Sequence, residues 1–385
     1  MWRSVASNAA NFLMVALFLM AGIIIWGKAQ YTSPGPAAQA FCLQVERGSN
    51  WRRVSDSLEK IDAVTDGKIF RLGADYAGKS DQLKAGNFLV EVNASMESIV
   101  EIITRSGAST CGVEVIFRVG VNRIMVQVRE MDPANNRFVE RAEFELAAKD
   151  QPEIYTTVKS EGDTRYRIAF AEGVTSWQVV YALRSLDFLS GEILEIPPEG
   201  ALAPDSYEMQ LGDKRSDILE AMIEKQELWV SAAWAARNPL VPLESPEELL
   251  TLASIIEKET GVAEELGKVA SVFINRLNRG MRLQTDPTVI YGITKGQAVL
   301  GRGLKRSELK AVTPWNTYLI NGLPPTPIAN PGRASLMAAG QPDETNFVYF
   351  VADGTGGHAF AETLDEHNRN VAIWRKIEAE KTIDN

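Results

Sequence analysis

The chain contains the segment Leu252-Ala253-Ser254-Ile255-Ile256-Glu257-Lys258-Glu259-Thr260, which lies at the end of a predicted helix. One apolar stripe of this helix is expected to face a core, because apolar residues recur at helical spacing at Leu249, Leu252, Ala253 and Ile256. At about 100° per residue, Glu259 falls within that stripe, whereas Glu257 falls to one side and Lys258 points roughly opposite. The pattern therefore places a carboxylate on a face that ought to be buried.

The start of the same helix is also marked. Ser245 can cap it, Pro246 suits the first helical position, and Glu248 completes a capping box three residues after Ser245. These signals indicate where the helix begins and therefore which residues share its apolar stripe.

Glu259 is the candidate catalytic residue. A carboxyl group directed into an apolar wall either has a partner or has a raised pKa, and a raised pKa is what a general acid needs at neutral pH. The alternative is a solvated helix end, where a carboxylate is mildly unfavourable against the helix dipole. On the helix alone the solvated end is the commoner case, and the residues after Glu259 favour the catalytic interpretation.

Length and composition limit the possible functions. At 385 residues the chain should form two or three units, and 45% apolar with 23% charged residues is typical of globular protein. A net charge of −10 argues against a nucleic-acid partner, since phosphate binding needs a basic face. With two histidines and two cysteines, Cys-rich zinc modules are excluded, and we expect no metal and no cofactor.

The N-terminal segment sets the predicted compartment. Residues 12–26 carry no charge, and the sequence predicts a cytoplasmic tail at 1–8 and a transmembrane helix at 9–27. A cleaved signal peptide with a site near Ala38-Gln39-Ala40 is the alternative. Both interpretations place the rest of the chain outside the cytoplasm.

A linker at 28–40 is predicted to lead into a LysM-like module at 41–111, with a strand, helix, helix and strand pattern. Cys42 and Cys111 flank this module, so a disulfide is one expectation and two buried free thiols are the other. A fainter echo of the unit occurs at residues 168–183, where a strand, a Gly turn and a helix with Trp177 follow one another.

The middle of the chain has strand composition. Residues 113–119, 123–129 and 137–145 alternate partly, and they predict a β-meander inserted over 112–167, with the character of a spacer or a partner-docking surface. A second α/β subdomain is predicted for 168–244.

Residues 245–385 form the predicted catalytic domain. A second amphipathic helix over 266–277 should end near Gly280. The loops beyond it concentrate amides, hydroxyls and aromatic rings, which suit a carbohydrate because rings cover the apolar face of a sugar and amides bond its hydroxyls. The candidates are Gln284, Thr285, Asp286, Tyr291, Trp315, Asn316, Tyr318 and His358. Taken singly, each more often caps or turns backbone.

Other kinds of site are less well supported. Gly354-Thr355-Gly356-Gly357 lacks the lysine of a phosphate loop and the spacing of a dinucleotide turn. A hydrolytic triad could use His358, but no Gly-x-Ser-x-Gly elbow accompanies it.

Several segments in order resemble the endolytic murein transglycosylase family (MltG, or YceG-like). Besides residues 252–260, they include Lys268-Val269-Ala270-Ser271-Val272-Phe273-Ile274-Asn275-Arg276-Leu277, Met281-Arg282-Leu283-Gln284-Thr285-Asp286-Pro287-Thr288-Val289-Ile290-Tyr291-Gly292, Asn316-Thr317-Tyr318, Gly322-Leu323-Pro324-Pro325-Thr326-Pro327-Ile328 and Tyr349-Phe350-Val351-Ala352-Asp353-Gly354. The match is dense over about 207–370 and looser before it, and the β-meander departs from the family's short form.

The sequence patterns and the resemblance together predict an α+β protein with an N-terminal transmembrane helix, a LysM-like α/β module, the inserted β-meander and a C-terminal α+β catalytic domain, of which the β-meander is predicted from the residues alone. It implies a single-pass inner-membrane enzyme with a periplasmic catalytic domain, which cleaves nascent peptidoglycan strands between MurNAc and GlcNAc and leaves 1,6-anhydro-MurNAc ends. Cell-wall synthases or the division or elongation machinery are the implied partners. The family's catalytic glutamate corresponds to Glu259, the residue that the helix-face argument selects.

Two other functions stay open. A muramidase-like hydrolase would use Glu259 and Asp286 as a carboxylate pair, although Asp286 before Pro287 more often organises a loop. A non-catalytic glycan-binding scaffold would use the LysM-like region alone.

Overall fold

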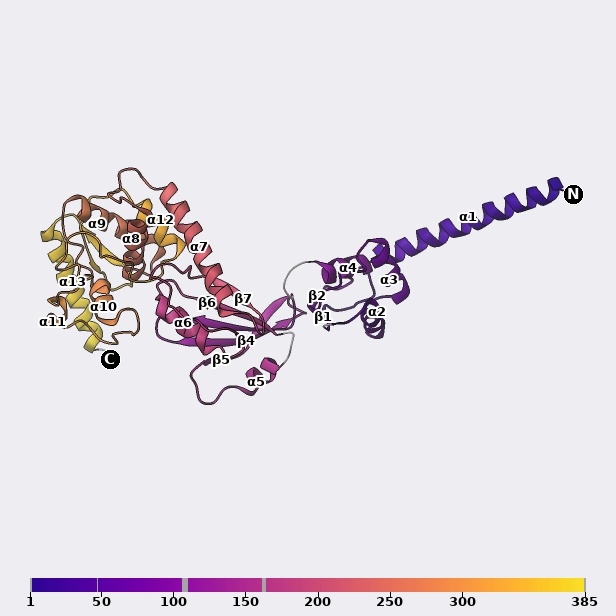
Figure 1. The fold of residues 1–385 in the computed structure, drawn as a ribbon, viewed down its shortest axis with the longest axis horizontal. Helices are drawn as coiled ribbons and strands as arrows, with labels where there is room; N and C mark the ends of the chain where they lie inside the picture. The colour runs from indigo at the N-terminus through magenta and orange to yellow at the C-terminus, as the bar shows by residue number, and fades with distance from the viewer. Residues whose placement is uncertain (1, 47, 106–109, 161–163, 384–385) are drawn as a thin grey trace. The chain divides into compact units, whose positions relative to one another are not determined.

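The computed structural model describes residues 2–46, 48–105, 110–160 and 164–383, and it divides into two compact units. The first comprises Met1–Val115, Gln127–Glu143 and Asp150–Arg165, and the second comprises Ile116–Val126, Phe144–Lys149 and Tyr166–Asn385. Figure 1 shows the elements of both along the chain. The architecture is mixed α and β, as the sequence predicts.

The first unit begins with a long apolar helix, α1 (Trp2–Thr32). Within it, Asn11–Thr32 has a mean hydropathy of 2.1 and is long and apolar enough to cross a membrane. The helix runs past residue 27, where the transmembrane segment was expected to give way to a linker. Pro34 is the first proline of the sequence, and a proline disfavours helical backbone at the residue preceding it.

A strand, helix, helix and strand then follow in the predicted order. Strands β1 (Phe41–Val45) and β2 (Gly86–Val90) pair antiparallel, with Phe41 opposite Val90 and Val45 opposite Gly86. Helices α2 (Trp51–Lys60), α3 (Gly67–Tyr76) and α4 (Met96–Thr104) pack with this strand pair around one core. Leu58, Phe70 and Ile99 are fully buried in the core they share. The likeness to a LysM module stays a prediction.

Cys42 and Cys111 form a disulfide, with their Cα atoms 5.6 Å apart. This confirms the first of the two expectations for these cysteines, and the alternative of two free thiols is wrong. The bond joins β1 to the segment beside β2, where the backbone N–H of Cys111 donates to Asn87 O at 3.1 Å.

The echo expected near residue 168 is a strand-to-helix connection that recurs in the described part of the chain, and the copies named below are those in which a side chain caps the helix. In each copy a strand ends, a turn follows, a residue with positive φ comes three positions after the strand, and the helix N-cap comes two positions later. The positive-φ residues and N-caps are Gly48 and Asn50, Asn93 and Ser95, and Gly173 and Thr175. Glycine and asparagine tolerate this backbone, and the capping side chains bond the first free amides of the helix.

The predicted β-meander is present but is not a separate insert. Strands β3 (Val113–Val119), β4 (Ile124–Asp132) and β5 (Arg137–Glu145) are neighbours in one sheet of order β5-β4-β3-β6-β7. Strand β6 (Arg165–Phe170) pairs antiparallel with β7 (Ser206–Met209), with Tyr166 opposite Met209. The boundary predicted at residue 167 thus falls inside a strand, because pairing between β3 and β6 continues the sheet across it.

The remaining elements are mainly helices. They are α5 (Glu153–Ser160), α6 (Ser176–Ser185), α7 (Arg215–Ala235), α8 (Pro246–Glu259), the 3-10 helix η1 (Ala263–Glu265), α9 (Leu266–Asn278), α10 (Asp286–Thr294), α11 (Arg306–Leu309), α12 (Arg333–Gly340), β8 (Tyr349–Ala352), β9 (His358–Ala361) and α13 (Leu364–Ile383). Strands β8 and β9 form an antiparallel pair in which Ala352 lies opposite His358.

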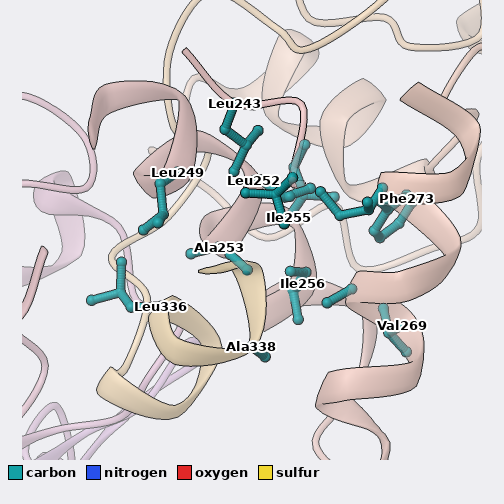
Figure 2. Packing of buried hydrophobic residues seen from close by; sticks show 14 of the residues in the cluster. Leu243, Leu249, Leu252, Ala253, Ile255, Ile256, Val269, Phe273, Leu336 and Ala338 are labelled. Atoms are coloured by element: carbon teal, nitrogen blue, oxygen red, sulfur yellow. The ribbon is translucent and has the colours of Figure 1, made fainter. Parts of the chain in front are cut away.

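Helix α8 lies at the centre of the second unit's core. Figure 2 shows its side chains gathered with those of α9 and α12, and Leu252 and Ile255 extend toward Phe273. All three are fully buried. The predicted apolar stripe is therefore confirmed, and the buried face is wider than the stripe because Thr251 and Ser254 are also buried.

The start of α8 and the end of α9 follow the sequence signals, with one difference. The Ser245 hydroxyl caps α8 by accepting from the Glu248 N–H at 3.3 Å, but the Glu248 carboxylate accepts from the Glu244 N–H at 2.7 Å. The predicted capping box is thus half formed. Gly280, with φ +65°, follows the last turn of α9 where the sequence predicts its end.

Candidate functional site

Glu259 is the last residue of α8, and its carboxylate oxygen Oε1 accepts a hydrogen bond from the Thr285 hydroxyl. The side chain is partly buried, beyond the fully buried stripe that ends at Ile256. Helix packing therefore anchors the backbone that carries Glu259, while its carboxyl group meets the start of α10.

A network of three threonines holds the segment that meets Glu259. Thr285 is the N-cap residue of α10 and is 3% exposed, and its N–H donates to the Thr317 hydroxyl at 3.0 Å. The Thr288 hydroxyl donates to Thr285 O at 2.7 Å and lies 2.8 Å from that of Thr317. Gln284 enters this segment with φ +48° and its N–H donates to Thr317 O at 3.2 Å. Thr285 is thereby fixed before any ligand arrives.

Burial raises the pKa of Glu259 above its usual range. The hydrogen bond from Thr285 opposes this rise, nearby Asp286 adds to it, and the charges of His358 and Arg276 oppose it. Burial prevails, so the carboxyl group holds its proton to a higher pH than a solvated glutamate does. This is the state that a proton donor requires.

Asp286 and Tyr318 form a pair at the edge of the site. The Tyr318 hydroxyl donates to Asp286 Oδ1 at 2.7 Å, and burial together with this carboxylate raises the pKa of Tyr318. Asp286 is exposed in the first turn of α10, and Gln284 is exposed two residues earlier. These groups are the solvent-facing part of the cluster around Glu259.

Two residues that sequence reasoning missed complete the cluster. Arg276 on α9 is 8% exposed, and it donates to Val348 O at 2.7 Å and to Leu283 O at 2.5 Å. Glu265 at the end of η1 bonds to His358. A charged residue inside the apolar repeat of α9 is the signal that could have identified Arg276, whereas nothing local to Glu265 indicates its partner.

Asn316 does not face the cluster. It is fully buried, its side-chain amide donates to Leu309 O at 3.1 Å and to Ala311 O at 2.7 Å, and its oxygen accepts from the Tyr318 N–H. Its polar atoms therefore hold the loop that carries Thr317 and Tyr318, and the expected substrate contact of this residue stays a prediction.

Tyr291 lies in the second half of α10, farther along the helix than Thr285 and Asp286. Its hydroxyl bonds to Glu199, and its ring meets that of Trp315 edge-on with centroids 5.7 Å apart. Glu199 also accepts from the Ser176 N–H at 2.8 Å, and burial raises its pKa to about 7. Tyr291 thus belongs to a second polar cluster, in which Glu199 was missed by the sequence analysis.

The two residues before Glu259 hold the helix end in place. Glu257 accepts from the Gly332 N–H at 2.9 Å and from the Ser335 hydroxyl at 2.7 Å. Lys258 donates to Gly173 O at 3.2 Å, and burial lowers its pKa. Among the residues that the structure describes, no group of three or more His, Cys, Asp or Glu side chains is arranged to hold a metal ion.

Replacing Thr285 by Val should move the alkaline limb of the activity profile to higher pH. The variant keeps the shape of the side chain but removes the donor, so Glu259 would hold its proton more tightly. A hydrogen bond to a charged group contributes about 1.5–3 kcal/mol, and one pKa unit is about 1.4 kcal/mol, so a shift of about one to two pH units is expected. Thr285→Ser retains the hydroxyl and should leave the limb in place; an equal shift in both variants would argue against this role.

Comparison with known proteins supplies independent information. A model of the YceG-like family matches residues 43–373. The chain is 30% identical over 330 residues to a protein of Bacillus subtilis (strain 168) named endolytic murein transglycosylase, covering 85% of this chain and 82% of the relative. It is 26% identical over 360 residues to a protein of the same name from Streptococcus pneumoniae serotype 2 (strain D39 / NCTC 7466), covering 57% of that relative. A crystal structure of a yceG-like protein from Listeria monocytogenes aligns with 86% of this chain and 99% of its own, at 23% identity and a TM-score of 0.42.

Proposed function

Because this chain belongs to the YceG-like family, we propose that it is an endolytic murein transglycosylase, an enzyme that cleaves peptidoglycan glycan strands internally. Two relatives of that name each align with 85% of this chain. The proposal extends to the bond and the products: cleavage between MurNAc and GlcNAc without water, leaving 1,6-anhydro-MurNAc ends.

The observation that carries this proposal is the environment of Glu259. A carboxyl group whose pKa burial raises, beside a fixed hydroxyl donor, is suited to deliver a proton to a leaving oxygen and to receive one afterwards. Glu259 would protonate the glycosidic oxygen as the bond breaks. It would then accept the proton of the sugar's own 6-hydroxyl as that oxygen closes on the anomeric carbon.

This sequence of steps explains how one carboxyl group suffices. Glycosidases commonly use a second carboxylate as base or nucleophile, because water or the enzyme must attack the sugar. In the proposed reaction the attacking oxygen belongs to the substrate. The nearby Asp286 is exposed and bonded to Tyr318, which supports a substrate-binding and loop-organising role.

We assign substrate contact to the polar groups around Glu259. Gln284 and Asp286 are exposed, and Thr285, Tyr318 and His358 are less exposed, so hydroxyl and amide groups of a glycan would meet donors and acceptors there. Tyr291 on α10 and Trp315, whose ring meets it edge-on, offer aromatic surface for a more distant sugar.

The proposed location follows from the apolar helix α1. We infer a single-pass anchor in the inner membrane, with the N-terminus cytoplasmic and the catalytic domain periplasmic. Such an anchor would keep the enzyme close to newly made strands, and cell-wall synthases or the division or elongation machinery are the expected partners.

Mass spectrometry of the released glycan tests the chemistry. The full-length chain, incubated with purified peptidoglycan, should release fragments with anhydro ends, which lack one water relative to hydrolysis products. Reducing ends would instead identify a hydrolase, with Glu259 and Asp286 as its carboxylate pair. Binding without any release would leave only a glycan-binding scaffold.

A further inference from the structure

Both oxygens of the Glu265 carboxylate bond to the same residue, His358. Oε1 accepts from the backbone N–H of His358 at 2.8 Å, and Oε2 lies 2.7 Å from the ring nitrogen Nδ1 of the same residue. The two side chains are 13% and 16% exposed, so water competes little for these bonds. The contact joins residues 93 positions apart and determines how the His358 ring is oriented at the start of β9.

The same carboxylate also reaches the end of α8. The Thr260 hydroxyl donates to Glu265 Oε2 at 3.4 Å, and Thr260 is the residue immediately after Glu259. A further bond, from the Val262 N–H to the Thr260 hydroxyl at 3.0 Å, fixes that hydroxyl. Glu265 therefore connects His358 to the backbone that carries Glu259.

The chemistry of the pair selects one protonation pattern for the ring. An ionised carboxylate only accepts, so Nδ1 must carry a hydrogen to bond to it. In the neutral ring, Nε2 is then left as an acceptor. A sugar hydroxyl is a suitable donor to such a nitrogen, whereas the other tautomer would present an N–H there.

His358 is also electrostatically coupled to Glu259. When the ring is protonated, its positive charge opposes the rise in the pKa of Glu259 that burial causes, as does the charge of Arg276, while Asp286 adds to the rise. The His358 ring also makes edge-on contacts with Phe350 and Phe360, whose ring centroids lie 5.3 and 6.4 Å from its own. The charged groups around this region include Glu265, Glu259, Asp286 and Arg276, with Lys268 over the Phe360 ring and Asp353 beside Gly357.

We propose that Glu265 is a positioning residue for the reaction: it holds His358 beside Glu259 with Nδ1 protonated and Nε2 free to accept from the glycan. The inference rests on the proposed function for its catalytic consequence, and on the hydrogen bonds above for its structural content. It adds Glu265, and a defined tautomer of His358, to the residues selected from the sequence.

Nitrogen NMR of the imidazole rings tests the structural part directly. The chain has only two histidines, so a His367→Gln variant assigns the spectrum of the full-length protein in micelles. At a pH where His358 is neutral, the wild type should show Nδ1–H. In Glu265→Gln the amide oxygen would keep the backbone N–H and the NH₂ would donate to Nδ1, so Nε2–H is expected. An Nε2–H tautomer in the wild type would overturn the proposal.

Kinetics of glycan release test the functional part. Glu265→Gln should lower kcat at least 10-fold with KM changed less than twofold, since positioning acts on the bound complex. Gly357→Ala should act similarly, because an added Cβ would lie 2.7 Å from Glu265 Oε1 and φ at Gly357 lies outside the left-handed region. Glu264→Gln changes an exposed neighbouring carboxylate and should have no effect.

The outcomes separate this proposal from the proposed function. Unchanged kcat in both Glu265→Gln and Gly357→Ala, with the tautomer altered in Glu265→Gln, would refute the positioning role while leaving the transglycosylase assignment intact. If the wild type releases no anhydro products, the transglycosylase assignment fails together with the catalytic role given to Glu265. The tautomer experiment then still decides whether Glu265 holds the ring as described.

Discussion

Replacing Glu259 by Gln should reduce the release of anhydro-ended glycan by about 10²–10⁴-fold, the factor that a positioned proton donor contributes. The amide has the size of the carboxyl group and can still accept from Thr285, so the packing of α8 should not change. It has no acidic proton to deliver. The measurement is the initial rate of release from purified peptidoglycan, with folding checked by hydrogen exchange of the α8 amides.

The matched control is Glu257→Gln, two residues earlier on the same helix. Its oxygen can still accept from Gly332 and Ser335, and it takes no part in the proposed chemistry. Activity within about threefold of the wild type is expected, because the amide oxygen keeps both hydrogen bonds that hold the end of α8. Full activity in Glu259→Gln would show that Glu259 is not the proton donor. An equal loss of activity in both variants would indicate a structural effect.

The part of the site that lies on α8 could be predicted because the relevant signals are local. The cap at Ser245, Pro246 and the spacing of Leu249, Leu252 and Ile256 lie within one helix, and they determine which way Glu259 points. The order of elements in the first unit could be predicted for the same reason, since each strand and helix carries its own periodicity.

The rest of the site depends on contacts between distant segments. Glu265 meets His358 across 93 positions, and Thr317 meets Thr285 across 32, so neither pairing leaves a pattern in either segment. The tertiary fold brings these segments together, and it also commits Asn316 to backbone partners. Both Asn316 and Tyr318 are polar loop residues, so the sequence could not show that Asn316 bonds to backbone while Tyr318 bonds to Asp286.

The β-meander shows the same limit at the level of the fold. Its strands were recognised from alternation, which is a property of each strand separately. Its status as an insert depended on which strand pairs with β3, and alternation carries no information about pairing partners.

Truncation of Phe273 to Ala should destabilise the second unit by about 3–5 kcal/mol, the cost of removing a large buried ring and leaving a cavity. Phe273 is fully buried on α9, in the cluster that it shares with Leu252 and Ile255 of α8 (Figure 2). It also meets Phe350 edge-on, with centroids 5.9 Å apart. Hydrogen exchange of α8 and α9 amides is the measurement, because it reports the unfolding of this unit rather than of the whole chain.

Two further variants separate burial from the mere loss of a side chain. Val312→Ala removes methyl groups at a position that is 91% exposed and should change the unfolding free energy by less than about 0.5 kcal/mol. Phe273→Leu leaves a smaller cavity and should fall between the two. Phe350, which Phe273 contacts, also packs against His358, so the loss of the ring should loosen the site as well as the core. A cost below about 1 kcal/mol for Phe273→Ala would mean that α8, and with it Glu259, is not held by this core.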